Sequence, residues 1–289
     1  EEFTKITEII RDWINFNSVT VYSETTEKGL IRHLYLRKAF ATGEIMVCLV
    51  INGNTIPAQD DLLDKLKEID GFKTLVININ RENTNVVLGK ECKTIHGDGY
   101  IEDTLCGCVF RISPKSFYQI NPVQTEKLYN KAMEFAALDS KSRVIDAYCG
   151  IGTIGLVAAK TAGEVIGVEL NPDAVKDAIS NCKRNSMKNA RFYCADAGDF
   201  MEMISEEGES ADVVFMDPPR AGSSKKFIES LAKMAPKRVV YISCNPETLA
   251  RDLFALRKKY KVEKIQPVDL FPYTNHIETV VCLKLKCRS

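Results

Sequence analysis

Short apolar runs alternate with amphipathic stretches over the second half of the chain. Runs rich in Val and Ile occupy 144–148, 165–169, 213–216, 239–243, 262–270 and 279–285, and apolar residues at helical spacing occupy 122–137, 154–162 and 172–185. Such strands, separated by helices, predict a mostly parallel sheet covered on both faces. Asn121 before Pro122 is typical of a helix N-terminus, and another helix is predicted to begin at Pro246.

The pattern before residue 120 predicts a mixed α+β structure instead. Helical spacing is found at positions 3, 6, 9, 10 and 13 and again over 62–69, and strand-like runs at 30–36, 45–51, 74–79, 86–88, 92–95, 100–105 and 108–113. A turn is predicted at 96–99. We therefore predict an α/β protein with a small α+β domain over 1–120 and a Rossmann-like domain over 121–289.

The composition is that of a folded globular protein and excludes extensive disorder. The 289 residues are 45% hydrophobic and 27% charged. The 39 basic residues balance 39 acidic ones, so the net charge does not indicate a nucleic-acid partner. No apolar run approaches the roughly 18 residues of a membrane span, and the first residues do not resemble a signal peptide. These features predict a cytoplasmic protein without a membrane partner.

Ten cysteines fit a reducing compartment, where most are expected to be small buried hydrophobic residues. Cys106 and Cys108 are the only close pair, and no second pair follows at the spacing of a zinc site. We therefore predict neither a disulfide framework nor a metal site.

A glycine-rich loop follows the first predicted strand of the second domain. Gly150, Gly152 and Gly155 form G-x-G-x-x-G between a strand and a helix, which predicts a nicotinamide, flavin or S-adenosylmethionine (SAM) site. Glu169 ends the next strand, where a carboxylate can accept hydrogen bonds from ribose hydroxyls. Asp146 stands just before the glycines and suits an amino-acid ammonium better than a pyrophosphate, so SAM is favoured.

A second motif, Asp217-Pro218-Pro219-Arg220, follows the apolar run at 213–216. Asp-Pro-Pro sequences at such a strand end resemble the substrate-side motif of nucleic-acid methyltransferases. Two adjacent prolines stiffen a loop and remove its backbone donors. The loop can therefore project Asp217 towards a planar base and the cofactor.

A nucleophile and a base are predicted further along the chain. Cys244 ends a strand and faces a predicted helix N-terminus, whose dipole favours the thiolate. Cys149 lies inside the glycine loop, where contact with the cofactor is expected rather than attack. Glu278 begins an apolar strand, and a partly buried carboxylate there would have a raised pKa and could act as a base. His276 is the rival base.

Five motifs in this order resemble the RNA 5-methyluridine methyltransferases, which use SAM to methylate C5 of uridine in ribosomal or transfer RNA. The motifs are residues 116–121, the glycine loop, 217–220, 243–246 and 276–278. The block from 29–34 through Gly43 to 100–101 resembles the smaller domain that precedes the catalytic one.

The resemblance implies a role for individual residues. Cys244 is the nucleophile and Glu278 the base that removes the C5 proton. Besides Gly150 and Gly152, the cofactor-binding positions are Gln119, Tyr148, Glu169 and Asp217. Phe117 matches an aromatic that stacks on an RNA base. Arg220 and Asn245 are candidates for uracil or loop contacts.

The chemistry of uracil agrees with these residue types. Thiolate addition at C6 makes C5 enolate-like, so that C5 can take a methyl group from SAM. A base then removes the C5 proton and the cysteine is expelled, which requires one nucleophile, one base and no metal. The uridine must also leave its stack, which gives an aromatic such as Phe117 a function.

The resemblance implies an RNA partner, for which we favour 23S ribosomal RNA over transfer RNA, and a monomer. An RNA cytosine-5 methyltransferase would use the same thiol chemistry, and a catalytically silent RNA-binding relative would lack Cys244 or Glu278. Many members of the family carry an N-terminal RNA-binding barrel and a four-cysteine iron–sulfur region. Neither is expected in this chain, because no run of closely spaced cysteines precedes residue 92.

Overall fold

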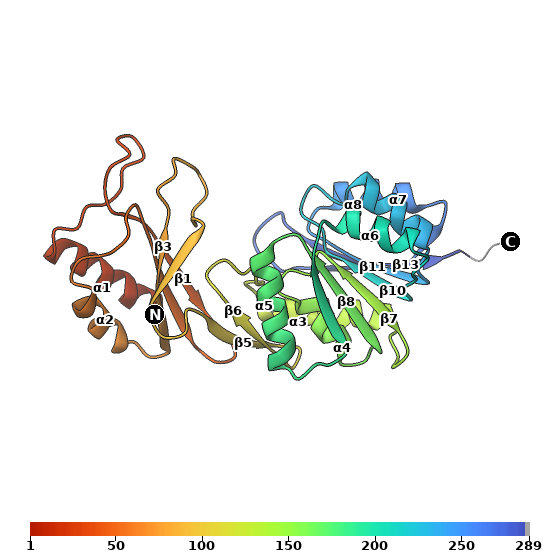
Figure 1. Ribbon diagram of the computed structural model, residues 1–289, viewed down its shortest axis with the longest axis horizontal. Helices are drawn as coiled ribbons and strands as arrows, with labels where there is room; N and C mark the ends of the chain where they lie inside the picture. The colour runs from red at the N-terminus through yellow and green to blue at the C-terminus, as the bar shows by residue number, and fades with distance from the viewer. Residues whose placement is uncertain (287–289) are drawn as a thin grey trace. The chain divides into compact units, whose positions relative to one another are not determined.

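The computed structural model describes residues 1–286 and divides into two compact units (Figure 1). Unit 1 comprises residues 1–104 and 111–115, and unit 2 comprises residues 105–110 and the chain from residue 116 onward. Each unit has its own core. Cys287 lies outside the described residues, and the nine cysteines before it are free thiols, of which five are buried.

Unit 1 is a four-stranded sheet with two helices. Its elements are α1 (Glu2–Phe16), β1 (Ile31–Lys38), β2 (Ile45–Ile51), α2 (Gln59–Lys67), β3 (Phe72–Ile79) and β4 (Glu91–His96). The strand order is β1-β2-β3-β4, and only β2 and β3 run parallel, because α2 connects them. Alternate residues of β2 pack with Trp13 of α1 and Leu66 of α2 in one core.

The strand predicted at 86–88 is wrong. Val86 is 62% exposed, and the segment forms an irregular loop. The carbonyls of Val86 and Val87 accept hydrogen bonds from Nδ2 of Asn80 at 2.8 and 3.1 Å, so a side chain takes the place of a neighbouring strand. A short two-stranded sheet, β5 (Ile101–Leu105) with β6 (Cys108–Ile112), follows β4 as predicted.

Unit 2 contains a seven-stranded sheet in the order β12-β13-β11-β10-β7-β8-β9. Its elements are α3 (Pro122–Ala136), β7 (Arg143–Ala147), α4 (Thr153–Ala159), β8 (Glu164–Glu169), α5 (Pro172–Arg184), β9 (Ala190–Cys194), α6 (Ala197–Glu206), β10 (Val213–Met216), α7 (Lys225–Met234), β11 (Arg238–Ser243), α8 (Pro246–Leu256), β12 (Tyr260–Val268) and β13 (Glu278–Leu285). The strands from β7 to β11 are parallel, and β13 is antiparallel to both its neighbours.

Helices cover both faces of this sheet, which confirms the predicted architecture. The helices α6, α7 and α8 pack on one face through a core that includes Phe200, Phe227 and Leu249, and α3, α4 and α5 cover the other (Figure 1). The predicted cap of α3 is also confirmed, because the Asn121 side chain accepts a hydrogen bond from the Gln124 N–H at 3.2 Å.

Candidate active site

A cavity of about 680 Å³ opens in unit 2 where the parallel strands end. Ligands of open α/β sheets bind at this edge. The cavity brings together nine of the residues singled out in the sequence: Phe117, Gln119, Tyr148, Gly150, Glu169, Asp217, Arg220, Cys244 and Glu278. These residues come from six segments that are well separated along the chain, so the fold itself assembles the site.

The glycine loop is tied to the end of β8. The N–H of Gly150 donates a hydrogen bond to Glu169 Oε2 at 3.1 Å, and Glu169 Oε1 accepts one from the Asn171 N–H at 2.8 Å. Gly150 has φ +55° and open space where a Cβ would stand, and Tyr148 before it has φ +64°. The loop therefore turns sharply and leaves its cavity side open to a ligand.

The remaining glycines of the motif serve packing rather than the cavity. Gly152 is the N-cap of α4 and does not line the cavity; a Cβ there would lie 3.0 Å from the Phe192 ring. A Cβ on Gly155 would lie 2.9 Å from Asp146 Oδ2. The structure therefore does not bring Gly152 into the predicted cofactor contact.

Asp146 is fully buried beneath the loop. Its Oδ2 accepts a hydrogen bond from the Gly155 N–H at 2.7 Å, and its Oδ1 finds no partner among the described residues. Burial raises the pKa of Asp146 to about 7, against the effect of the Gly155 N–H. This carboxyl fixes the start of α4 from inside.

The two predicted catalytic side chains are neighbours because β13 runs antiparallel to β11. Ser243 pairs with Thr279 at the end of this ladder, so Cys244 and Glu278 are the next residues on the two strands. Both side chains line the cavity, and Glu278 is only 5% exposed. His276, the rival base, is exposed and does not line the cavity.

Asp217 and Glu278 share this part of the cavity, and the buried Asp146 lies near enough to act on the charge of Asp217. Burial raises the pKa of Asp217 to about 8, with further contributions from the charges of Glu278 and Asp146. Burial also raises the pKa of Glu278, as predicted, and the nearby Arg220 opposes this shift. These carboxyls therefore hold their protons at a higher pH than exposed ones do.

The predicted preference of Cys244 for the thiolate is wrong for the free protein. Burial has the largest effect and raises the pKa of this thiol. The charges of Glu278 and Asp217 raise the pKa further, and the charge of Arg220 lowers it. Burial of the thiol, the largest of these effects, outweighs the dipole of the helix that follows, because that dipole amounts to only about half a charge. The resting residue is therefore the neutral thiol.

Phe117 and Asn245 differ in their accessibility to a substrate. Phe117 lines the cavity and is 72% exposed, so its ring can meet a planar base. The Asn245 side chain caps α8 by accepting a hydrogen bond from the Glu247 N–H at 2.9 Å, and its Nδ2 donates to the Arg220 carbonyl at 3.2 Å. Asn245 is not among the residues that line the cavity, so its contact with the substrate stays a prediction.

The sequence reasoning missed Asp196, which also lines the cavity. Asp196 follows β9 and caps α6 by accepting hydrogen bonds from the N–H groups of Gly198 and Asp199 at 2.8 and 3.0 Å. An Asp three residues before another Asp is a recognisable helix start, so the signal was present. Phe271 and Leu170 add apolar lining that was not predicted either.

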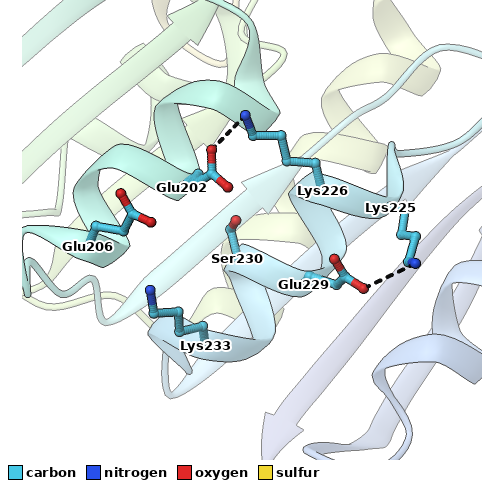
Figure 2. A pocket seen from close by; sticks show the side chains of 7 residues that line it. All are labelled: Glu202, Glu206, Lys225, Lys226, Glu229, Ser230 and Lys233. Atoms are coloured by element: carbon cyan, nitrogen blue, oxygen red, sulfur yellow. Dashed lines mark ion pairs between the residues drawn. The ribbon is translucent and has the colours of Figure 1, made fainter.

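A charged hollow of about 430 Å³ between α6 and α7 has a different character (Figure 2). Lys226 pairs with Glu202 at 2.6 Å and Lys225 with Glu229 at 3.7 Å. These exposed charges satisfy one another and are screened by solvent, so we assign the hollow to the solvated surface of the two helices.

Asp217→Asn is expected to remove a pH dependence of stability. The folded protein holds the Asp217 proton up to about pH 8, whereas the unfolded chain loses it near the ordinary value of 3.8. Because the folded pKa is raised, the stabilisation is complete below the unfolded pKa and is lost as pH rises to about 8. The Tm of the wild type relative to the variant should therefore fall between about pH 5 and pH 8.

Thermal melts of both proteins across this range provide the test. Asp212→Asn is the control, because a hydrogen bond from the Arg143 N–H lowers the pKa of Asp212 and moves its titration below this range. Its Tm difference from the wild type should stay constant. An equally constant difference for Asp217→Asn would contradict the assignment.

The strand order and the cavity at the ends of the parallel strands match the Rossmann-like fold of SAM-dependent methyltransferases. The sequence profile described as tRNA (Uracil-5-)-methyltransferase matches residues 18–286, and the chain belongs to this family. An uncharacterized RNA methyltransferase of Caldanaerobacter subterraneus is 45% identical over 97% of this chain and 62% of its own length. One of Staphylococcus epidermidis is 46% identical over 94% of this chain and 60% of its own.

Among solved structures, the Pyrococcus abyssi tRNA (uracil-54, C5)-methyltransferase in complex with S-adenosyl-L-homocysteine is similar, with a TM-score of 0.80 and 29% identity. The match covers 96% of this chain and 65% of that one. The chain thus spans about three fifths of the length of the curated relatives it matches. Within residues 1–286 the structure shows neither a helix suited to crossing a membrane nor a cluster of three or more potential metal ligands.

Proposed function

We propose that this chain transfers a methyl group from SAM to C5 of a uridine in RNA. The observation that carries the proposal is the pairing of Cys244 with Glu278 at the end of the β11–β13 ladder, inside the cavity that also contains the glycine loop. A thiol nucleophile beside a carboxyl base is the pair that C5 methylation of uracil requires.

The cavity fits SAM by the chemistry of its lining. Glu169 and Asp196 offer side-chain oxygens to ribose hydroxyls and to positive charge, and Asp217 offers a carboxyl group. Val168 and Leu170 offer apolar surface to a purine. Gln119, Tyr148 and Gly150 complete the proposed cofactor set. SAM supplies the methyl group and a sulfonium charge that lowers the pKa values of Cys244 and the neighbouring carboxyls.

Glu169→Ala is expected to weaken SAM binding by about 1.5–3 kcal/mol, which is the range for a hydrogen bond to a charged group. The substitution also removes the acceptor of the Gly150 and Asn171 N–H groups, so the glycine loop loses its tie to β8. Calorimetric titration with SAM measures the change. Glu164→Ala, at the start of the same strand and paired with Arg143 at the surface, should bind as the wild type does. Equal affinity of the Glu169→Ala protein would remove this residue from the cofactor set.

In the proposed reaction Cys244 is the nucleophile and Glu278 is the general base. Cys244 loses its proton to solvent water, and the thiolate attacks C6 of the uracil and makes C5 nucleophilic. After C5 has taken the methyl group, Glu278 removes the C5 proton as its carboxylate, and the C6–sulfur bond breaks. Phe117 is proposed to stack on an RNA base, with Arg220 near the uracil.

The RNA target remains part of the proposal. We favour 23S ribosomal RNA, and transfer RNA is the second candidate because the family description and the Pyrococcus abyssi enzyme both name tRNA. We also propose a monomer acting in the cytoplasm. Mapping 5-methyluridine in ribosomal and transfer RNA from cells that lack the gene tests the target: the position that loses its methyl group identifies it.

Two rival functions predict different products. An RNA cytosine-5 methyltransferase would leave 5-methylcytidine, and a silent relative would bind RNA without modifying it. The presence of Cys244 and Glu278 in one cavity argues against the silent relative. Nucleoside analysis of RNA after incubation with SAM distinguishes a uridine methyltransferase, which leaves 5-methyluridine, from a cytosine methyltransferase, which leaves 5-methylcytidine.

A further inference from the structure

The loop between β10 and α7 carries Asp217 and Arg220 and is held by side chains of α8. Asp252 of α8 is 3% exposed, and its Oδ2 accepts hydrogen bonds from the Ser223 N–H at 2.9 Å and from the Tyr241 hydroxyl at 2.8 Å. A buried carboxylate with two donors on one oxygen fixes both donor groups. The end of the loop is thereby tied to β11 through Asp252.

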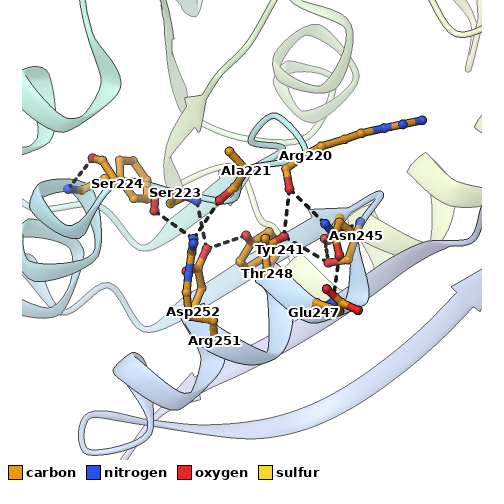
Figure 3. A network of polar contacts seen from close by, with 12 residues as sticks. Arg220, Ala221, Ser223, Ser224, Tyr241, Asn245, Glu247, Thr248, Arg251 and Asp252 are labelled. Atoms are coloured by element: carbon orange, nitrogen blue, oxygen red, sulfur yellow. Dashed lines mark hydrogen bonds and ion pairs between the residues drawn. The ribbon is translucent and has the colours of Figure 1, made fainter.

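Arg251 extends this tie along the loop (Figure 3). Its Nε and Nη2 both lie 2.8 Å from Asp252 Oδ1, and Nη2 also donates to the carbonyls of Ala221 and Ser223 at 3.0 and 3.3 Å. The planar guanidinium can bind the carboxylate and the two carbonyls together, which a lysine ammonium cannot do in the same geometry.

The first turn of α8 holds the other end of the same loop. The Arg220 carbonyl accepts hydrogen bonds from Asn245 Nδ2 and Thr248 Oγ1, both at 3.2 Å. Figure 3 shows the Arg220 side chain pointing away from this network, so its backbone is fixed while its guanidinium is left for the cavity.

Gly222 makes the close approach of loop and helix possible. It has φ +77°, and a Cβ there would lie 2.3 Å from Arg251 Nη2 and 2.9 Å from Asp252 Oδ2. On its other side the network reaches the cavity, because the Tyr148 hydroxyl donates to Ser223 Oγ at 3.4 Å. The contacts therefore connect α8 with Tyr148 and with the loop of Asp217 and Arg220, all of which line the cavity.

We propose that Arg251 and Asp252 are positioning residues that set Asp217 and Arg220 in place relative to Cys244. The inference rests on the proposed function. Helix α8 begins two residues after Cys244, so the helix that follows the nucleophile also grips the opposing loop. A displacement of about 1 Å at reacting groups can cost about 10²-fold in rate. Arg251 and Asp252 can therefore affect the rate through the loop, although neither residue contacts the substrate.

Single-turnover methyl transfer with labelled uridine RNA and saturating SAM tests this pair. Arg251→Ala should lower the rate constant by about ten-fold or more, and Arg251→Lys should fall between it and the wild type. Arg257→Ala is the matched control, because Arg257 ends the same helix, stacks on Phe254 and makes no contact with the loop among the described hydrogen bonds. It should react at the wild-type rate.

A purely structural role gives a different result. Partial unfolding lowers the number of SAM sites per protein in a calorimetric titration, but it leaves the rate constant of the folded fraction unchanged. Positioning lowers the rate constant while the site number stays near one. Tyr241→Phe, which removes one hydrogen bond to Asp252 and keeps the ring, provides a milder variant if Arg251→Ala folds poorly.

Hydrogen exchange separates failure of this inference from failure of the proposed function. The Ser223 amide, which donates to Asp252, should exchange about ten-fold faster or more in Arg251→Ala than in Arg257→Ala, with no RNA present. A wild-type protein that methylates no uridine defeats the proposed function but leaves this measurement valid. Unchanged Ser223 exchange, or an Arg251→Ala rate equal to that of Arg257→Ala, would overturn the positioning role.

Discussion

Cys244→Ala is expected to abolish both covalent attachment to RNA and methyl transfer. Uracil C5 is too weak a nucleophile to attack a methyl group unaided, and without the thiol no bond to C6 can form. Removal of a nucleophile that forms a covalent intermediate leaves only binding and cofactor placement. Denaturing electrophoresis of the variant with labelled uridine RNA and SAM should therefore show no shifted band.

Cys194→Ala is the matched control for this loss. Cys194 is an exposed thiol that does not line the cavity, so the variant should keep both the adduct and the activity. A covalent band with the Cys244→Ala protein would assign the attack to another residue. Cys149 would be a poor substitute, because burial raises its pKa and the charges of Asp146 and Glu169 raise it further.

Glu278→Gln should produce the opposite outcome, a covalent complex that persists. Glutamine keeps the size of the side chain but cannot take the C5 proton, so methyl transfer can occur while release stalls. Loss of a general base costs about 10²–10⁴ in rate, which is enough to accumulate the methylated adduct. Electrophoresis should show the band, and mass spectrometry should find the methyl group within it.

The double variant and a neighbouring residue sharpen this test. Replacing Cys244 as well should remove the trapped band, since the adduct requires its sulfur. His276→Gln should turn over normally, because the His276 side chain is exposed and does not line the cavity; it packs edge-on against Phe271, which does. Full turnover by Glu278→Gln together with a stalled His276→Gln would transfer the base role to His276.

Local sequence patterns predicted most of the elements because burial and capping act locally. The strand Val213–Met216 and the helix start at Pro172 agree with the structure, since a short apolar run and an Asn-Pro cap each need few partners. Strand β9 and the helices α6 and α7 were not predicted. β9 is a largely exposed edge strand without an apolar run, and Asp196 was missed with it.

The electrostatics of the site could not be predicted in the same way. The dipole of α8 is a local property, and it favoured a thiolate at Cys244. The opposing charges come from Glu278 and Asp217, which only the sheet order brings near. The position of the antiparallel β13 between β11 and β12 depends on tertiary packing, which no local sequence pattern predicts. The same holds for the contacts of Arg251 and Asp252 with a loop some thirty residues earlier in the chain.

Tritium release from RNA labelled at C5 of uridine tests the central claim most directly. Methylation at C5 must expel the hydrogen already there, so the wild-type chain with SAM should release one tritium into water for each methyl group transferred. The release should depend on SAM, disappear in Cys244→Ala, and be absent when the label is on C5 of cytidine. Methyl transfer without release from uridine, or release from cytidine alone, would contradict the account.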